Sequence, residues 1–323
     1  MNDGGGAPVS TNYDVVVAGG GLAGLSAGLA SARLGRKTLV LVGDILGGQL
    51  LSINKIDGYP GFPEGIAGYD LGPMTQEQAA AAGAEFATTE LAALVPDGGG
   101  WRLTASDGET YGARGVVIAT GAGLKKLGVP GEERLFGKGV SHCASCDAPL
   151  MRGKTVAVIG GGDSAAQEAL TLAEAAARVV ILHRGAALRA QAAYRDAVAS
   201  NPKIELRYNS EVMEIVGEAS VTGVKVRDRA TDGTSLVEVA GVFAYIGLAP
   251  NSAFVAGQIA LDPDARIPTD STMRTALKGI CAAGAVCAGW PGRAAAAAGD
   301  GAAAAIAIDR YLSDDEWCVP IAR

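Results

Sequence analysis

Histidine and cysteine, two side chains that often hold transition metals, are scarce in this sequence of 323 residues. There are two histidines, His142 and His183, and five cysteines, of which a single pair stands at the spacing of metal ligands. A metal site is therefore not expected, because no second cysteine or histidine pair could complete it. An odd, sparse set of cysteines in a long chain also argues against a framework of structural disulfides.

Basic charge is limited as well: 27 lysine and arginine residues face 34 aspartate and glutamate residues, for a net charge of −7. No run of basic residues occurs, so the electrostatic footprint of a nucleic-acid binder is missing. The alanine-rich tract near the C-terminus is too short to span a bilayer and is interrupted by Gly299-Asp300-Gly301. Residues 1–12 have neither a basic start nor an apolar stretch, so we expect a flexible N-terminus and a cytoplasmic protein without a membrane partner.

Aromatic residues are few, at 5%, whereas hydrophobic residues make up 49% of the chain. Alanine and glycine dominate, which suits tightly packed α/β layers and ligand grooves lined by backbone. The length corresponds to about two domains.

Residues 13–42 predict a strand, a glycine turn, a helix and a second strand. The turn carries Gly19-x-Gly21-x-x-Gly24, a dinucleotide-binding fingerprint. The first glycine allows the tight turn, the second lets the backbone approach a pyrophosphate, and the third lets helix and strand pack closely. The pyrophosphate would lie at the N-terminus of the helix, and Asp44 follows the second strand, where a carboxylate can bind a ribose.

The same pattern recurs at residues 154–183, with Gly160-x-Gly162-x-x-Ala165 and a helix from about Asp163. The chain therefore carries two predicted dinucleotide sites. The second strand of this repeat ends in His183-Arg184, with Arg189 five residues beyond, and no carboxylate follows it. A carboxylate there would bind a free ribose 2′-hydroxyl, whereas arginine suits a 2′-phosphate, so the second site favours NADP(H).

The segment "SHCASCDA", residues 141–148, holds Cys143 and Cys146 with two residues between them. Such a pair can bind a metal, staple a loop, or exchange electrons as a dithiol and a disulfide. Because metal and structural disulfides are both disfavoured by the rest of the composition, redox exchange is the leading interpretation.

The motifs "GGGLAG", "GYPGFPEGIAGYDL", "VVIATGA", "GKGVSHCASCDA", "VAVIGGGDSAAQEAL" and "VFAYIGLAPN" follow one another as in the low-molecular-weight thioredoxin reductases. The sequence resembles this family from about residue 13 to 313. The resemblance implies an α/β fold of two Rossmann-like domains of the three-layer ββα type, the second inserted in the first. Residues 13–122 and 248–323 would form the FAD-binding domain, residues 123–247 the NAD(P)H-binding domain with the cysteine pair, and two chains a homodimer.

The resemblance assigns the catalytic chemistry to Cys143, Cys146 and Asp147. Cys146 would face the flavin, Cys143 would attack the disulfide of a thioredoxin-like protein or a small disulfide partner, and Asp147 would move the thiol proton. Further FAD-binding positions carried over from the family motifs are Gly48, Gln49, Asn54, Ala119, Thr120, Gly121, Gly284, Ala285, Arg293 and Ala294. The NADPH site would comprise Gly160, Gly162, Asp163, Ser164, His183, Arg184 and Arg189.

Four positions depart from the family pattern. Gly185 stands where the family has a second arginine, Ala285 replaces an aspartate that binds FAD, and Ala148 replaces a glycine after the cysteine pair. An alignment without gaps places Arg293 in the position of a glutamine near the flavin, whereas a shift of one residue makes it the family's own arginine. Both alignments remain open.

These departures leave the direction of electron flow open. The first hypothesis is a reductase that passes electrons from NADPH through FAD to the disulfide. The second is a dithiol oxidase that forms a disulfide in a small natural-product dithiol and is reoxidised by dioxygen or NADP⁺. A flavoprotein that only binds is disfavoured by the intact Cys-x-x-Cys-Asp sequence. Cys281, Cys287 and Cys318 are expected to be structural.

Overall fold

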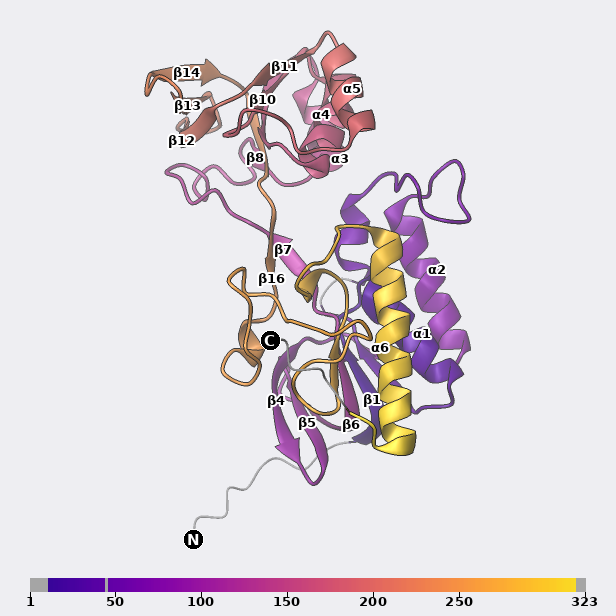
Figure 1. The fold of residues 1–323 in the computed structure, drawn as a ribbon. Coiled ribbons are helices and arrows are strands. Elements are labelled where there is room, and N and C mark those ends of the chain that lie inside the picture. The colour runs from indigo at the N-terminus through magenta and orange to yellow at the C-terminus, as the bar shows by residue number, and fades with distance from the viewer. Residues whose placement is uncertain (1–10, 44–45, 318–323) are drawn as a thin grey trace. The chain divides into compact units, whose positions relative to one another are not determined.

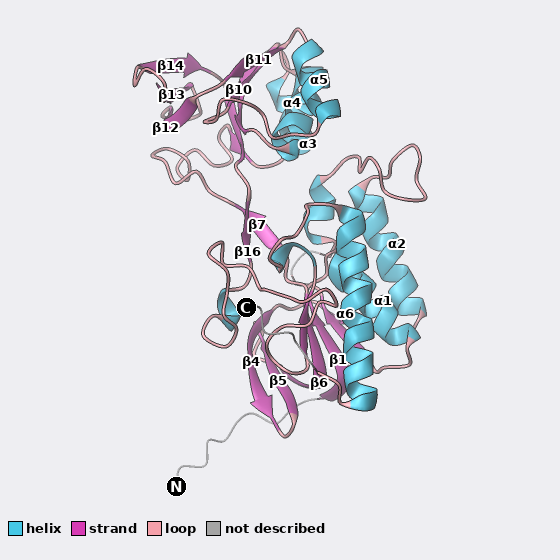
Figure 2. Ribbon diagram, in the orientation of Figure 1, coloured by secondary structure: helices cyan, strands magenta, loops and turns pink. Residues whose placement is uncertain are grey.

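The computed structural model describes residues 11–43 and 46–317 (Figures 1 and 2). The chain divides into two compact units, one formed by residues 1–123 and 249–323 and the other by residues 124–248. The second unit is thus an insertion between two parts of the first. Strands β7 (Ala122–Leu124) and β16 (Leu248–Pro250), in which the chain passes between the units, pair with each other.

The first unit is built on a sheet of seven strands. Strands β3 (Glu85–Ala87), β2 (Thr38–Leu41), β1 (Thr11–Ala18) and β6 (Thr110–Ile118) run parallel, and β17 (Ile280–Ala282) pairs parallel with β6. Strands β5 (Gly100–Ala105) and β4 (Leu91–Asp97) extend the sheet beyond β6 in antiparallel fashion. Strand β2 is the second strand that the sequence predicts within residues 13–42.

The first strand starts earlier than the sequence predicts. Thr11 and Asn12 were expected in a flexible N-terminus, but they pair with Tyr111 and Gly112 of β6. The part of that expected segment before Thr11 lies outside the described residues. The β-branched and aromatic residues of the run explain the strand itself, whereas its extension depends on a partner strand a hundred residues away.

Three helices cover one face of this sheet: α1 (Leu22–Arg33), α2 (Gly68–Ala81) and α6 (Ala294–Asp314). Helix α6 approaches α1 very closely, because a Cβ atom at Gly301 would lie 2.0 Å from the carbonyl oxygen of Ala23. The other face of the sheet packs on a second apolar core with Val255, Ile259 and Ile267 from the segment after β16. Short 3-10 helices occur at Gly48–Ser52, Ala253–Val255 and Gly284–Val286.

The second unit has three layers. A parallel sheet in the order β11 (Ile204–Arg207), β10 (Arg178–Leu182), β9 (Thr155–Gly160), β15 (Gly241–Tyr245) and β8 (Val140–Ser141) lies in the middle. One face packs on α3 (Ala144–Asp147), α4 (Asp163–Ala175) and α5 (Ala192–Ser200), with a 3-10 turn at Ala148–Met151. The other face packs on the antiparallel strands β12 (Ser210–Val216), β13 (Gly223–Asp228) and β14 (Thr234–Glu238). The predicted three-layer α/β fold, and the predicted helix start at Asp163, are confirmed.

Candidate functional site

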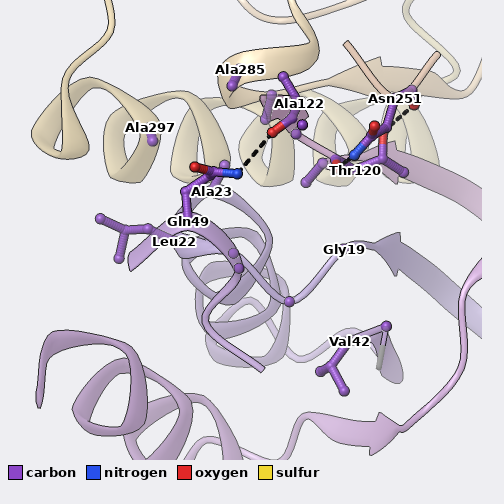
Figure 3. Close-up of a pocket in the computed structure, with 18 of the residues that line it drawn as sticks. Gly19, Leu22, Ala23, Val42, Gln49, Thr120, Ala122, Asn251, Ala285 and Ala297 are labelled. Carbon is purple, nitrogen blue, oxygen red and sulfur yellow. Dashed lines mark hydrogen bonds between the residues drawn. The ribbon is translucent and has the colours of Figure 1, made fainter. Parts of the chain in front are cut away.

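The first unit contains a cavity of about 940 Å³ at the carboxyl ends of its parallel strands (Figure 3). Nine of the predicted FAD-binding residues line it: Gly19, Gly21, Gly48, Gln49, Ala119, Thr120, Gly121, Ala285 and Ala294. Asp44 lies outside the described residues. The structure thus gathers residues from three distant parts of the sequence around one space.

The glycine turn after β1 explains how the backbone reaches this cavity. Gly19 has a φ of +124°, and a Cβ atom there would lie 2.2 Å from the carbonyl oxygen of Ala119. A Cβ atom at Gly24 would lie 1.8 Å from the carbonyl oxygen of Gly19, so α1 can pack on this turn only because residue 24 is glycine. Gly24 does not line the cavity, and its place is in the helix–strand contact.

Polar groups on the cavity wall are held by mutual hydrogen bonds (Figure 3). Gln49 Nε2 donates to the carbonyl oxygen of Ala122 at 3.1 Å. Thr120 Oγ1 donates to the carbonyl oxygen of Asn251 at 2.7 Å, and Asn251 Nδ2 donates to the carbonyl oxygen of Thr120 at 2.9 Å. This reciprocal pair fixes the two segments that flank the inserted unit in the sequence.

Besides Gly24, three predicted FAD-binding residues, Asn54, Gly284 and Arg293, are not among those that line the cavity. Asn54 is exposed. The backbone N–H of Gly284 donates to Asp300 Oδ2 at 3.2 Å, and burial raises the pKa of Asp300. Arg293 is the exposed residue before α6, and its guanidinium donates to the carbonyl oxygen of Gly292 at 3.0 Å.

The cavity is also lined by four residues that the sequence did not predict, Glu90, Asn251, Phe254 and Trp290. Asn251 ends the motif "GLAPN", so a signal for it was present in the sequence. Glu90 and Trp290 come from loops and Phe254 from the 3-10 helix Ala253–Val255, and no local pattern distinguishes these three residues.

The residues around the cavity fit FAD. The volume lies at the upper end of the range for small-molecule sites, as a large ligand requires. The Cβ position of Gly21, at the start of α1, is open, so the backbone there can approach a ligand closely. Glu90 is the only charged residue among the described lining residues, so the pyrophosphate would rely on N–H groups at the N-terminus of α1. FAD supplies two-electron redox chemistry when it is bound.

The second glycine turn follows β9. Gly160 has a φ of +147°, and a Cβ atom there would lie 2.3 Å from the carbonyl oxygen of Tyr245. Gly162 precedes α4 and has open space at its Cβ position, as Gly21 has in the first unit. Asp163, in the first turn of α4, accepts hydrogen bonds from the backbone and side chain of Gln191, at 2.7 and 2.9 Å, and Ser164 is exposed.

The predicted basic residues of this site lie beside the glycine turn. Arg189 donates its backbone N–H to the carbonyl oxygen of Gly161 at 2.6 Å, and both Arg184 and Arg189 are exposed. His183 is buried, and a Cβ atom at Gly161 or Gly185 would lie 2.3 or 2.7 Å from its ring. Burial lowers the pKa of His183, with smaller effects in the same direction from Arg189 and Arg184. The neutral ring is therefore packed against the turn.

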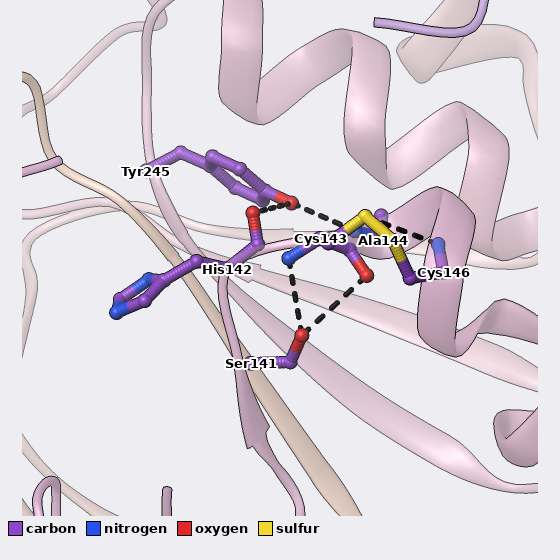
Figure 4. Close-up of a disulfide and its surroundings, with 6 residues drawn as sticks. All are labelled: Ser141, His142, Cys143, Ala144, Cys146 and Tyr245. Atoms are coloured by element: carbon purple, nitrogen blue, oxygen red, sulfur yellow. Dashed lines mark hydrogen bonds between the residues drawn. A yellow bond between two sulfur atoms is a disulfide. The ribbon is translucent and has the colours of Figure 1, made fainter. Parts of the chain in front are cut away.

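Cys143 and Cys146 form a disulfide at the start of α3 (Figure 4). Cys143 is half-buried and Cys146 is exposed. The Cys146 N–H donates to Cys143 Sγ at 3.2 Å, and the Cys143 N–H donates to Ser141 Oγ at 3.0 Å. The hydroxyl of Tyr245 accepts from the N–H of Ala144 at 3.1 Å and lies 3.4 Å from the carbonyl oxygen of His142. The backbone of the pair is thus fixed by two side chains of the parallel sheet.

Two further cysteines lie among the described residues, in the first unit. Cys281 and Cys287 are buried free thiols, and burial raises the pKa of both, to about 12 for Cys287. Cys318 lies outside the described residues. Within residues 11–43 and 46–317, no group of three or more His, Cys, Asp or Glu side chains could hold a metal ion. None of the described helices is both long enough and apolar enough to cross a membrane.

A protein-family model described as pyridine nucleotide-disulphide oxidoreductase matches residues 13–301. The chain belongs to this family. A thioredoxin reductase of Mycolicibacterium smegmatis is 39% identical over 307 residues, which cover 95% of this chain and 98% of the relative. A bifunctional thioredoxin reductase/thioredoxin of Mycobacterium leprae is 38% identical over 305 residues, covering 94% of this chain and 67% of the relative.

The crystal structure of Lactococcus lactis thioredoxin reductase matches with a TM-score of 0.90 at 35% identity, covering 94% of this chain and 99% of that one. The resemblance to low-molecular-weight thioredoxin reductases is confirmed. The chain is an FAD-dependent disulfide oxidoreductase of the thioredoxin reductase type, a class of enzyme that uses FAD and NADPH.

Proposed function

We propose that the enzyme works as a reductase, in which electrons pass from NADPH by way of FAD to the Cys143–Cys146 disulfide and then to a partner disulfide. The arrangement of the cysteine pair carries this proposal, because the Cys146 N–H already points at the sulfur of Cys143. Once the pair is reduced, this N–H would stabilise a thiolate on Cys143, the nucleophile that thiol–disulfide exchange needs.

In this proposal the first unit binds FAD and the inserted unit binds NADPH. The cavity lined by Gly19, Gly21 and Gln49 supports the first assignment. The glycine turn at Gly160, followed by exposed Arg184 and no carboxylate, supports the second.

The exchange balances in two steps. The Cys143 thiolate attacks one sulfur of the partner disulfide, which forms a mixed disulfide and releases one partner thiolate. The Cys146 thiolate then attacks Cys143 Sγ, restores the Cys143–Cys146 bond and releases the second partner thiolate. The partner gains two electrons, and two protons accompany them. Asp147, directly after the pair, is placed in the sequence to hand one of these protons on.

A thioredoxin-like protein is the proposed partner. In the Mycobacterium leprae relative, a thioredoxin reductase and a thioredoxin are joined in one bifunctional protein. We further infer a homodimer in the cytoplasm, where a dithiol would remain reduced. Sedimentation equilibrium of the purified holoenzyme tests the dimer, since a single species of about 65 kDa is expected from two chains of 32.4 kDa each.

The direction of electron flow is tested without oxygen. The holoenzyme is mixed with NADPH, with NADH or with a small dithiol, and bleaching of the flavin absorbance is followed in each case. Fast bleaching by NADPH, followed by recovery on addition of oxidised thioredoxin, is expected. If only the dithiol bleaches the flavin and air restores the colour, the reductase proposal fails and the enzyme is a dithiol oxidase.

A further inference from the structure

The segment after β10 presents two exposed arginines, Arg184 and Arg189, with Gly185 directly after the first. In a dinucleotide fold, the residues after the second strand of the unit contact the adenosine ribose, and arginine there suits a 2′-phosphate. Here Arg184 and Arg189 are exposed at this place, but Gly185 between them has no side chain. A doubly charged phosphate is best held by more than one guanidinium group.

The structure brings a further arginine to Gly185 from elsewhere in the unit. The N–H of Asn209, in the turn between β11 and β12, donates to the carbonyl oxygen of Gly185 at 3.1 Å. The N–H of Arg229, which follows β13, donates in turn to the carbonyl oxygen of Asn209 at 2.7 Å. Asn209 has a left-handed backbone, with a φ of 53°, a conformation that asparagine tolerates well. This conformation allows the two hydrogen bonds that connect Arg229 to Gly185 through Asn209.

The side chain of Arg229 also contacts the segment that contains Gly185. Its Nη1 donates to the carbonyl oxygen of Arg184 at 3.3 Å, so its guanidinium lies against the backbone of the predicted phosphate-binding residue. Three hydrogen bonds in all therefore join Arg229, directly or through Asn209, to Arg184 and Gly185. The residue is held in place although it stands 45 positions further along the chain.

The charge of Arg229 is available to a ligand. Arg229 is exposed and forms no ion pair among the residues that the structure describes. The nearby carboxylate of Glu211 is bound by Arg227 Nη2 at 2.5 Å. The pKa of Glu211 is lowered mainly by its hydrogen bond to Arg227. The charges of Arg229 and Arg184 lower it further, so both of these arginines lie close enough to act on the same carboxylate.

We propose that Arg229 is a specificity-determining residue for NADP(H), which contacts the 2′-phosphate beside Arg184 and supplies the cation that Gly185 cannot. The proposal rests on the proposed function, in that the inserted unit must bind the nucleotide at the Gly160 turn. It goes beyond that function by naming a residue outside the dinucleotide-binding segment as the source of selectivity.

Direct binding to the FAD-loaded enzyme tests the proposal. Dissociation constants for NADP⁺ and NAD⁺ are measured by calorimetry for the wild type, Arg229→Ala and Arg229→Lys. The matched control is Arg134→Ala, because Arg134 is another exposed arginine of this unit whose Nη1 donates to one carbonyl oxygen, that of Glu218, at 3.1 Å. Melting curves and flavin content confirm that each variant is folded.

We expect Arg229→Ala to weaken NADP⁺ binding about tenfold, as the loss of one charge-assisted contact would do, and to change NAD⁺ binding by less than about twofold. Arg229→Lys should fall between, because a lysine keeps the charge but loses the planar fork. Arg134→Ala should match the wild type for both nucleotides. The dependence of NADP⁺ affinity on salt concentration should also become shallower in Arg229→Ala.

Other outcomes overturn the proposal in distinguishable ways. If Arg229→Ala weakens both nucleotides equally, Arg229 is a structural residue of the site and does not select the phosphate. If neither changes, the phosphate is held without it. If the wild type itself binds NADP⁺ no more tightly than NAD⁺, or binds neither, the proposed use of NADPH fails together with the role of Arg229.

Discussion

The backbone N–H of Cys146 donates a hydrogen bond to the sulfur of Cys143 at 3.2 Å, within the loop that their disulfide closes. The two sulfurs are therefore not equivalent, although one short sequence carries both. An N–H that points at one sulfur favours negative charge there after the disulfide is reduced.

The first prediction concerns this difference. When the enzyme is reduced and then treated briefly with a limiting amount of iodoacetamide, Cys143 should be labelled before Cys146, because the thiolate is the reactive form. Peptide mass spectrometry measures the labelling of each cysteine. Unreduced enzyme should be labelled at neither residue, and buried Cys281 and Cys287 should stay unlabelled in both samples. Faster labelling of Cys146 would contradict the proposed roles.

The second prediction concerns Tyr245, whose hydroxyl accepts the N–H of Ala144 inside the redox loop. Burial raises the pKa of Tyr245, so the hydroxyl stays protonated at all ordinary pH values. Tyr245→Phe leaves a buried N–H without a partner and should lower the stability by about 1–3 kcal/mol. Thermal melting measures the loss. Tyr208→Phe, at an exposed tyrosine of the same unit, should melt like the wild type, and equal losses in both variants would refute the assignment.

The third prediction is a dependence of stability on pH. Oε2 of Glu168, on α4, is buried and has no hydrogen-bond partner among the described atoms. Burial raises its pKa from the usual value near 4.5 to about 7. Between these two values the folded protein retains a proton that the unfolded chain releases, so stability falls as the pH rises through this window.

Glu168→Gln should remove this effect. At pH 5 the variant and the wild type should have similar stability, whereas at pH 8 the variant should be more stable, by on the order of 1–3 kcal/mol. Melting temperatures at the two pH values measure the difference. Glu174→Gln, at an exposed glutamate of the same helix, should leave the pH dependence of melting as it is in the wild type. If the variant melts like the wild type at pH 8, ionisation of Glu168 does not lower the stability of the folded protein, and the prediction is wrong.

The fourth prediction uses two glycines of α6 that differ only in their surroundings. Gly301→Ala would bring a Cβ atom to within 2.0 Å of the carbonyl oxygen of Ala23, whereas Gly299→Ala meets nothing within 4 Å. The first substitution should destabilise the protein by about 1–3 kcal/mol or more and reduce the flavin that copurifies, because α1 and α6 both border the cavity. The second should stabilise by up to about 1 kcal/mol. Melting temperature and flavin absorbance measure both effects.

The parts of the site that depend on local backbone were predictable from the sequence. The turns at Gly19 and Gly160 follow from the spacing of glycines between a strand and a helix, and the structure gives both residues the positive φ that this spacing implies. The strand patterns "VTGVKVRD" and "GVFAYIGLAPN" likewise mark β13 and β15, because alternating or continuous apolar runs are a property of neighbouring residues.

Positions that depend on partners far along the chain were not predictable in this way. The extension of β1 to Thr11 depends on its pairing with Tyr111. The approach of Arg229 to Gly185 depends on a left-handed asparagine in a third segment. Phe254 and Trp290 line the cavity together with Gly19 and Ala119, which lie far from them in the sequence. In each case the sequence shows the residue but not its neighbour, because the neighbour is set by the packing of whole elements.

The pairing of β7 with β16 means that the inserted unit can be separated from the first unit at two neighbouring points of the chain. Paired strands lie about 5 Å apart, so the first and last residues of the inserted unit are neighbours in space. A gene for residues 124–248 alone would encode a polypeptide whose ends need no rearrangement. The flanking halves could in turn be rejoined by a linker of a few residues, which makes the chain a natural candidate for domain exchange between enzymes.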